Sequence, residues 1–284
     1  MPVDAVSLAA LLFAGFLHAS WNAFVKGADD PLVSIACLNI GMGALAVVLF
    51  ILAPLPEMAA WPWLLAGILL HTLYNIALAM AYSHGDYVQI YPLARGLAPM
   101  QIALVSMVLL PDESNGTILA GITILSLGVL ALGIWGNNST RSFNVRGIFW
   151  AVLTGSCIAG YTIIDGIGVR LAGTSAGFLA ILSFSQMILI NIWCFTQKGQ
   201  AIIALPLHLK LRYMVGGVMS GLAFLLVLWA IYQGVPIAVA AALRETSMVF
   251  ALGFSLYLLH ERLSMVRIVS VLAICLGVMV VKLG

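Results

Sequence analysis

Residues 117–136 read TILAGITILSLGVLALGIWG, a run without a single charged side chain. A helix that crosses the hydrocarbon core of a bilayer needs about 20 predominantly apolar residues. The strands of outer-membrane barrels instead alternate apolar and polar residues over segments of about ten, and the run shows no such alternation. The stretch therefore predicts a transmembrane helix.

Similar stretches recur along the whole chain. Across its 284 residues, 63% are apolar and 8% are charged, where a soluble domain carries roughly 25% charged residues. So few charges cannot cover a soluble globule, so the surrounding solvent is expected to be the lipid bilayer. The predicted fold class is an all-α integral membrane protein, multi-pass in the cell inner (plasma) membrane, with ten transmembrane helices. The predicted spans are 5–25, 32–53, 63–83, 88–110, 117–136, 147–169, 175–196, 212–231, 236–259 and 265–283.

Composition and motifs exclude several classes of function. The net charge is +2 and the basic residues are scattered singly, so nucleic acid is not expected as a partner. The four cysteines lie in apolar stretches without CxxC spacing, which predicts core positions and no metal site. GxSxG, HExxH and a phosphate-binding GK[ST] loop are absent from the sequence. We therefore expect no enzyme, no cofactor and no ATP-driven pump, but transport driven by a gradient or facilitated.

An internal repeat relates the two halves of the chain. AYSHGDYVQIYPLARGLAPM at 81–100 aligns with AIYQGVPIAVAAALRETSMV at 230–249, which pairs Gly85 with Gly234 and Arg95 with Arg244. Each half then holds five spans, at 1–140 and 141–284. An odd number of spans makes the second copy enter the membrane from the opposite face. This is the inverted-repeat plan of secondary transporters, which bind substrate near the midplane.

The distribution of basic residues predicts an orientation. Eight of them follow odd-numbered spans: Lys26, Arg141, Arg146, Lys198, Lys210, Arg212, Arg262 and Arg267. The opposite face holds only Arg170 and Lys282. By the positive-inside rule the first face is cytoplasmic, and both termini lie outside.

Two arginines lie deep within predicted spans. Arg95 is about eight residues, or roughly 12 Å, into its span, and Arg244 is equally deep from the other face. Placing an arginine there costs at least about 2.5–3.5 kcal/mol, which favours a substrate-binding or gating role. The alternative is a structural ion pair, in which Arg244 is neutralised by Glu245 or by Asp165.

Other polar residues share helical faces inside the spans. His18, Trp21 and Asn22 have i, i+3, i+4 spacing, and His71, Tyr74 and Asn75 repeat it. Such faces fit a wet cavity, or interhelical hydrogen bonds worth about 0.6 kcal/mol each. The candidate substrate-binding residues are His18, Trp21, Asn22, Tyr74, Asn75, Tyr91, Arg95, Tyr161, Arg244 and Ser247. Glu245 is the candidate for proton coupling.

These residues carry a family resemblance. HASWNAFVKG at 18–27, AYSHGD and YPLARGLAP at 81–99, and ALRETSMVFALGFSLYLLHERLS at 242–264 resemble the EamA branch of the drug/metabolite transporter superfamily. The resemblance covers essentially the whole chain. It implies two inverted five-helix repeats and a central cavity between spans 1, 3, 4, 6, 8 and 9. Family members are usually drawn with both termini cytoplasmic, whereas the charge count places them outside.

The function expected from these patterns is that of a gradient-driven permease, an exporter or exchanger of a small polar metabolite. Two cations at the cavity favour an anionic or zwitterionic substrate, such as an amino acid or an organophosphonate. The expected partners are this small molecule, the bilayer and protons as the coupling ion, and the protein is expected to be a monomer or homodimer. The alternatives are an exporter of cationic drugs or toxic compounds, and a non-transporting scaffold or flippase accessory protein.

Overall fold

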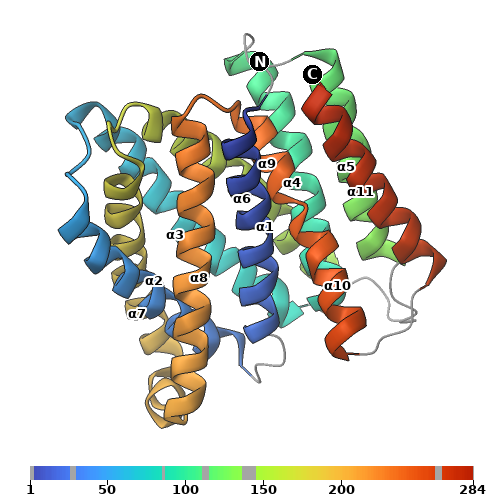
Figure 1. The fold of residues 1–284 in the computed structure, drawn as a ribbon. Helices are drawn as coiled ribbons and strands as arrows, with labels where there is room; N and C mark the ends of the chain where they lie inside the picture. Colours follow the sequence, from blue (N-terminus) through green and yellow to red (C-terminus); the bar gives the residue numbers. More distant parts are fainter. Residues whose placement is uncertain are drawn as a thin grey trace.

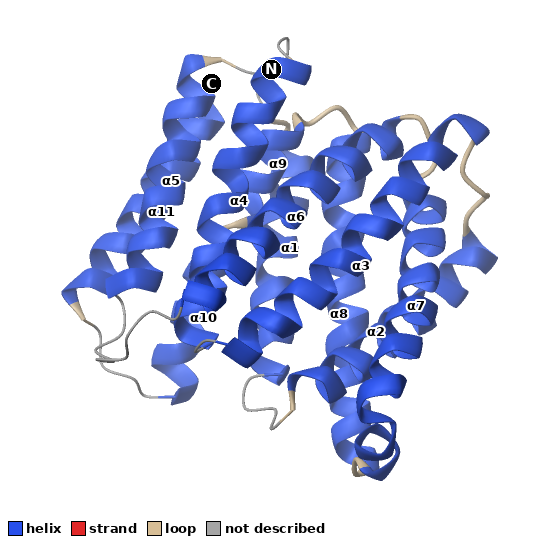
Figure 2. Ribbon diagram, turned by 180° about the vertical axis from the view of Figure 1, so that it is seen from behind, coloured by secondary structure: helices blue, strands red, loops and turns tan. Residues whose placement is uncertain are grey.

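The computed structural model describes residues 3–25, 30–84, 87–110, 115–135, 145–259 and 264–283. Within these ranges every regular element is a helix (Figure 2). The helices are α1 (Ala5–Val25), α2 (Pro31–Leu52), the short 3-10 helix η1 (Met58–Ala60), α3 (Trp61–His84), α4 (Tyr87–Leu109), α5 (Gly116–Trp135), α6 (Val145–Arg170), α7 (Ser175–Ala204), α8 (Leu207–Tyr232), α9 (Ile237–Arg244), α10 (Ser247–Leu259) and α11 (Met265–Leu283).

The all-helical membrane fold predicted from the sequence is confirmed. Eight segments are long and apolar enough to cross a membrane, and α4 and α5 contain the shorter apolar segments Leu93–Leu109 and Gly116–Leu132. The main difference in bounds concerns α7, which continues past the predicted end at 196 to Ala204. Its backbone kinks at Lys198, with φ −139° and ψ 26°, so the polar Lys198-Gly199-Gln200 bends the helix without ending it.

The helices before residue 140 pack mainly against those after it. The most extensive contacts join α5 to α11, α3 to α6, α2 to α7 and α1 to α8 (Figure 1). In the predicted repeat, α1 corresponds to α6 and α3 corresponds to α8. The contact between α3 and α6 in one half-to-half pairing therefore corresponds to the contact between α8 and α1. This pairing is the one expected for related halves. The predicted boundary between 140 and 141 lies outside the described residues, and the division stays a prediction.

Both ends of the chain lie at one end of the bundle (Figure 1). This arrangement follows from an even number of membrane crossings. Helix directions place Arg146, Lys198, Lys210, Arg212 and Arg267 toward the opposite end, and Arg170 and Lys282 near the termini. Lys26, Arg141 and Arg262 fall outside the described residues. Which end faces the cytoplasm stays a prediction.

The predicted ninth span is not one continuous helix. α9 ends at Arg244 and α10 begins at Ser247, because the Glu245 and Thr246 amides donate to carbonyls only three residues back, at 3.0 and 3.2 Å. Gly15 of α1 lies against this turn, and a Cβ there would be 2.6 Å from the Thr246 hydroxyl. The break thus sits in the middle of the bundle, where irregular backbone is tolerated only if protein or a water-filled cavity surrounds it.

Candidate substrate cavity

A cavity of about 470 Å³ lies between α1, α2, α3, α4, α6, α7, α8 and α9. Its size lies within the range of small-molecule sites. Many of its lining side chains are polar, although they project from apolar helices. These are His18, Trp21, Asn22, Ser34, Asn39, His71, Tyr74, Asn75, Tyr82, Arg95, Thr154, Tyr161, Gln186, Ser220 and Arg244.

The cavity extends toward the end of the bundle opposite the termini. Its lining includes Asn22 near the end of α1, Pro31 at the start of α2 and Tyr82 near the end of α3. These three helix ends lie together at that end (Figure 1). At the other extreme, the lining includes His71 and Arg244, which are about the middle of the bundle. The cavity therefore reaches from the middle of the bundle toward the end opposite the termini.

At the end near the termini, called the closed end below, side chains join α6 to α8 through hydrogen bonds to backbone carbonyls. Arg170, the last residue of α6, donates from Nη2 to the Val235 carbonyl at 3.1 Å. The Tyr232 hydroxyl donates to the Gly173 carbonyl at 3.1 Å. A cationic side chain on carbonyls beyond the end of a helix is also favoured by the helix dipole. These bonds fasten the ends of α6 and α8 to each other.

Arg95 forms a bidentate ion pair with Glu245. Its Nε and Nη2 atoms donate to the two carboxylate oxygens at 3.0 and 2.6 Å. Both side chains are buried, and the pair joins α4 to the break between α9 and α10. Two parallel charge-assisted hydrogen bonds fix direction as well as distance. Arg95 is therefore neutralised within the protein, and its partner is the carboxylate that the sequence alternative had assigned to Arg244.

His18 lies between two hydrogen-bond donors. Arg95 Nη1 is 2.6 Å from Nε2 of the imidazole, and the Trp21 indole nitrogen is 3.3 Å from Nδ1. A neutral imidazole accepts at one nitrogen and carries a proton on the other. Because arginine can only donate, the shorter contact assigns the lone pair to Nε2 and the proton to Nδ1. Trp21 also lines the cavity, and its N–H, which then has no acceptor on His18, can donate to an oxygen of a bound molecule.

Arg244 is the last residue of α9 and lines the cavity, with 7% of its surface exposed. Its Nε has no hydrogen-bond partner among the described residues, and no described carboxylate forms an ion pair with it. Glu245 is held by Arg95, and Asp165 by a histidine. A buried guanidinium with an unfilled donor is costly unless something supplies an acceptor.

His71 and Asp165 form a second polar pair. Nε2 of His71 is 2.7 Å from Oδ2 of Asp165, and the imidazole stacks on Tyr161 with ring centroids 3.9 Å apart. The His71 side chain is 13% exposed and that of Asp165 is 1% exposed. The histidine therefore stands between the cavity and a fully enclosed carboxyl group.

Comparison with known proteins agrees with this architecture. Residues 145–283 match the model of the EamA-like transporter family. The matched residues make up the second half of the chain. The family is part of the drug/metabolite transporter superfamily, and the match suggests a membrane transporter of that type. Such transporters are generally not enzymes.

One solved structure, described as "Crystal structure of protein", aligns with this chain over 98% of both chains. The TM-score is 0.78 and the sequence identity 18%, so the likeness shows the fold alone. No curated protein sequence matches the chain.

The structure brings most predicted site residues to one cavity. Eight of the ten candidates line it: His18, Trp21, Asn22, Tyr74, Asn75, Arg95, Tyr161 and Arg244. Ser247 and Glu245 are buried at the break between α9 and α10 and are not among the lining residues. Tyr91 belongs to α4, but its side chain lies outside the described part of the chain. The binding roles of these residues stay predictions.

Several lining residues were missed at the sequence level. Gln186 of α7 is 3% exposed and donates to the Ile68 carbonyl at 2.9 Å, and its Oε1 has no partner among the described residues. Asn39 of α2 is also buried at the cavity. Both are polar residues inside apolar spans, the same signal that identified His18 and Asn75. Applied to every span, it would have found them.

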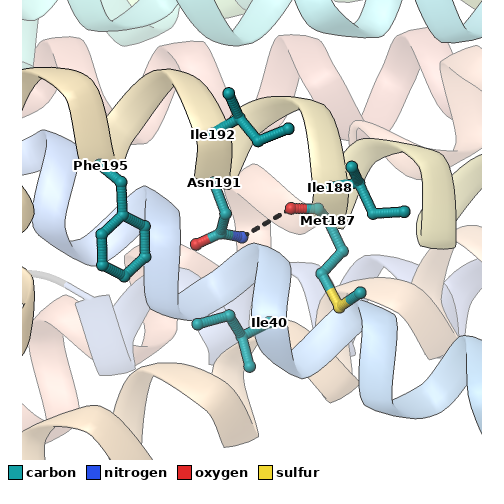
Figure 3. A pocket seen from close by; sticks show the side chains of 6 residues that line it. All are labelled: Ile40, Met187, Ile188, Asn191, Ile192 and Phe195. Carbon is teal, nitrogen blue, oxygen red and sulfur yellow. Dashed lines mark hydrogen bonds between the residues drawn. The ribbon is translucent and has the colours of Figure 1, made fainter.

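A second hollow, on the outside of the transporter, differs in character. It lies between α2 and α7 and is lined by Ile40, Met187, Ile188, Asn191, Ile192 and Phe195 (Figure 3). The Asn191 side chain donates to the Met187 carbonyl of its own helix at 2.8 Å. With five apolar side chains around one amide, this hollow has no charge to recognise a polar metabolite.

Proposed function

We propose that this transporter moves a small anionic or zwitterionic metabolite, such as an amino acid or an organophosphonate, across the inner (plasma) membrane. Movement is driven by a gradient, and export or exchange is the expected direction. The observation that carries the proposal is Arg244, a buried cation at the cavity with an unfilled donor and no carboxylate partner among the described residues.

Charge balance supports an anionic group on the substrate. Arg95 and Glu245 cancel each other through their bidentate pair, which leaves Arg244 as the cation that a ligand can compensate. A carboxylate or phosphonate can accept two parallel hydrogen bonds from a guanidinium, the geometry that Arg favours over Lys. An anion at this point converts a destabilising buried charge into a paired one.

Other lining groups would orient the remainder of the substrate. The Oε1 atom of Gln186 has no donor and offers an acceptor to a substrate ammonium or hydroxyl group. The indole N–H of Trp21 offers a donor, while Tyr74 and Phe224 limit the size of the apolar part. A zwitterion presents groups of both kinds.

The alternatives fit the cavity less well. An exporter of cationic drugs requires an uncompensated carboxylate, but Glu245 and Asp165 are each engaged, by Arg95 and by His71. A scaffold or flippase accessory protein has no need for a buried arginine facing a polar cavity.

The test is uptake and counterflow in proteoliposomes with labelled alanine, methylphosphonate and the cation tetraphenylphosphonium. We expect transport of at least one of the first two. Arg244→Gln should lower its apparent affinity about 10- to 100-fold, because a hydrogen bond to a charged group contributes about 1.5–3 kcal/mol. Arg212→Gln, which removes an exposed cation of α8, is the matched control. Transport of the cation alone, or unchanged affinity in Arg244→Gln, would contradict the proposal.

A further inference from the structure

The His71–Asp165 pair has no role in holding an anion, yet it lies at the same cavity. The carboxyl group belongs to α6 and is enclosed on all sides, while the imidazole belongs to α3 and reaches the cavity surface. The two helices are among the most closely packed in the bundle. The pair therefore links the open cavity to a buried point nearer the closed end.

The surroundings of Asp165 favour one proton on the pair. Oδ2 is 2.7 Å from His71, but Oδ1 has no hydrogen-bond donor among the described residues. It faces the backbone of Gly67, where an added Cβ would collide with it, and beyond that lies Leu182. A carboxylate with a neutral imidazole would be an uncompensated charge in a dry site. A proton on either group removes that charge.

Few other titratable groups face the pair. Tyr161 of α6 stacks on the imidazole and lies within electrostatic range of Asp165, Arg95 of α4 and Arg244 of α9. α8 contributes Phe224 and α7 contributes Leu182, neither of which titrates. The cations near the pair are therefore Arg95 and Arg244, and Arg95 is already neutralised by Glu245.

We propose that His71 and Asp165 form a proton-binding site whose occupancy is coupled to anion binding at Arg244. The coupling rests on the proposed function, since it requires an anion at Arg244. With one proton on the pair, the two residues are together neutral and Arg244 is a surplus positive charge. Without that proton the pair is negative and cancels Arg244, so the cavity has no net attraction for an anion. Proton and anion therefore bind together.

The proton has a defined route in the pair. It adds to the imidazole of His71 from the cavity, and the Nε2–H···Oδ2 hydrogen bond lets a proton pass to Asp165. The result is a neutral imidazole and a carboxylic acid, so one proton has been added and no charge is left behind. Since Asp165 lies further toward the closed end than His71, the proton is stored on the side that must open next. When the transporter exchanges one anion for another, the His71–Asp165 pair keeps its proton and no proton crosses the membrane.

Glu245, the coupling residue expected from the sequence, is less suited to this task. Both of its oxygens accept hydrogen bonds from Arg95, so a proton on Glu245 would break the bidentate pair. Asp165 has a vacant oxygen and a titratable neighbour that reaches the cavity. A proton site at Asp165 and a proton site at Glu245 therefore predict different infrared spectra for Asp165→Asn.

The first experiment needs no substrate. Infrared difference spectra of the purified transporter, recorded as the pH is stepped, should contain histidine and carboxyl signals that disappear in Asp165→Asn and in His71→Gln. His84→Gln should retain them, since the described hydrogen bonds of His84 lie within the end of its own helix. Unchanged spectra in Asp165→Asn would overturn the proton site.

The second experiment tests the coupling with methanesulfonate, an anion whose charge does not vary with pH. Proteoliposomes containing a pH-sensitive dye should acidify when wild type takes up methanesulfonate. Its apparent Kd should rise by up to about tenfold per pH unit above the titration of the pair, the limit for one linked proton. Asp165→Asn should lose acidification but keep methanesulfonate exchange. Uptake without acidification would overturn the coupling. Failure of wild type to move methanesulfonate would instead refute the anion site, leaving the infrared result to decide the proton site.

Discussion

Removal of Glu245 should destabilise the transporter more than removal of any surface charge. The perturbation is Glu245→Gln, which keeps the shape of the side chain but eliminates its charge. Arg95 then keeps a buried positive charge with 8% of its side chain exposed. Its contact with His18 at 2.6 Å cannot replace the lost charge, because the imidazole that accepts from a guanidinium is neutral.

The magnitude follows from the geometry of the pair. Two short charge-assisted bonds, at 3.0 and 2.6 Å, are lost or weakened together. Breaking a buried pair by removing one partner costs about 3–5 kcal/mol, most of it the penalty of the charge that stays behind. Arg95→Gln should cost a similar amount. The double variant removes both charges, so it should be more stable than the sum of the single effects by about 1–3 kcal/mol.

The assay is reversible unfolding in mixed micelles, followed by circular dichroism, for wild type, both single variants and the double variant. Arg212→Gln is the control for loss of an exposed charge. If the single variants unfold like wild type, or if their effects simply add, Arg95 and Glu245 are not a cooperating pair. Arg95 would then be open to the substrate role that its depth in the sequence favoured.

Three further variants test other parts of the structure. Gly15→Ala should lower the free energy of unfolding by about 1–3 kcal/mol, because the added methyl group would press on the break after α9. Gly253→Ala, which has open space around it, should not lower it. Equal stability of the two variants would contradict the close approach of Gly15 to the break. Arg170→Gln should loosen the closed end by releasing the Val235 carbonyl, seen as faster amide hydrogen exchange between α8 and α9, and unchanged exchange would exclude a fastening role. Trp21→Phe keeps the ring but removes the N–H donor, so affinity for a transported anion should fall about 2- to 10-fold in calorimetry; no change would show that the donor is not used.

The positions of the helices were predictable because lipid imposes a simple rule on sequence. Every stretch that must hide its backbone from hydrocarbon is both apolar and helical, so the ends of α1, α2 and α11 follow directly from composition. The split of the ninth span was not predictable in this way. No glycine or proline marks the turn at Glu245 and Thr246, and the break depends on contacts with α1 that are remote in sequence.

The candidate cavity shows a similar division. Buried polar residues such as Arg244 and Asn75 stood out against their apolar surroundings, so their arrival at one cavity could be anticipated. Their partners could not. Arg95 and Glu245 are 150 residues apart, and His71 and Asp165 are 94 apart, so which acid pairs with which base is decided by packing between the two halves.

Binding of methylphosphonate and of its uncharged dimethyl ester to purified wild type and to Arg244→Gln, measured by titration calorimetry, tests the central claim most directly. We expect wild type to bind the anion and not the ester, and Arg244→Gln to weaken anion binding about 10- to 100-fold. Equal binding of ester and anion by wild type, or equal affinity of wild type and variant for the anion, would contradict the claim that Arg244 receives the negative group of the substrate.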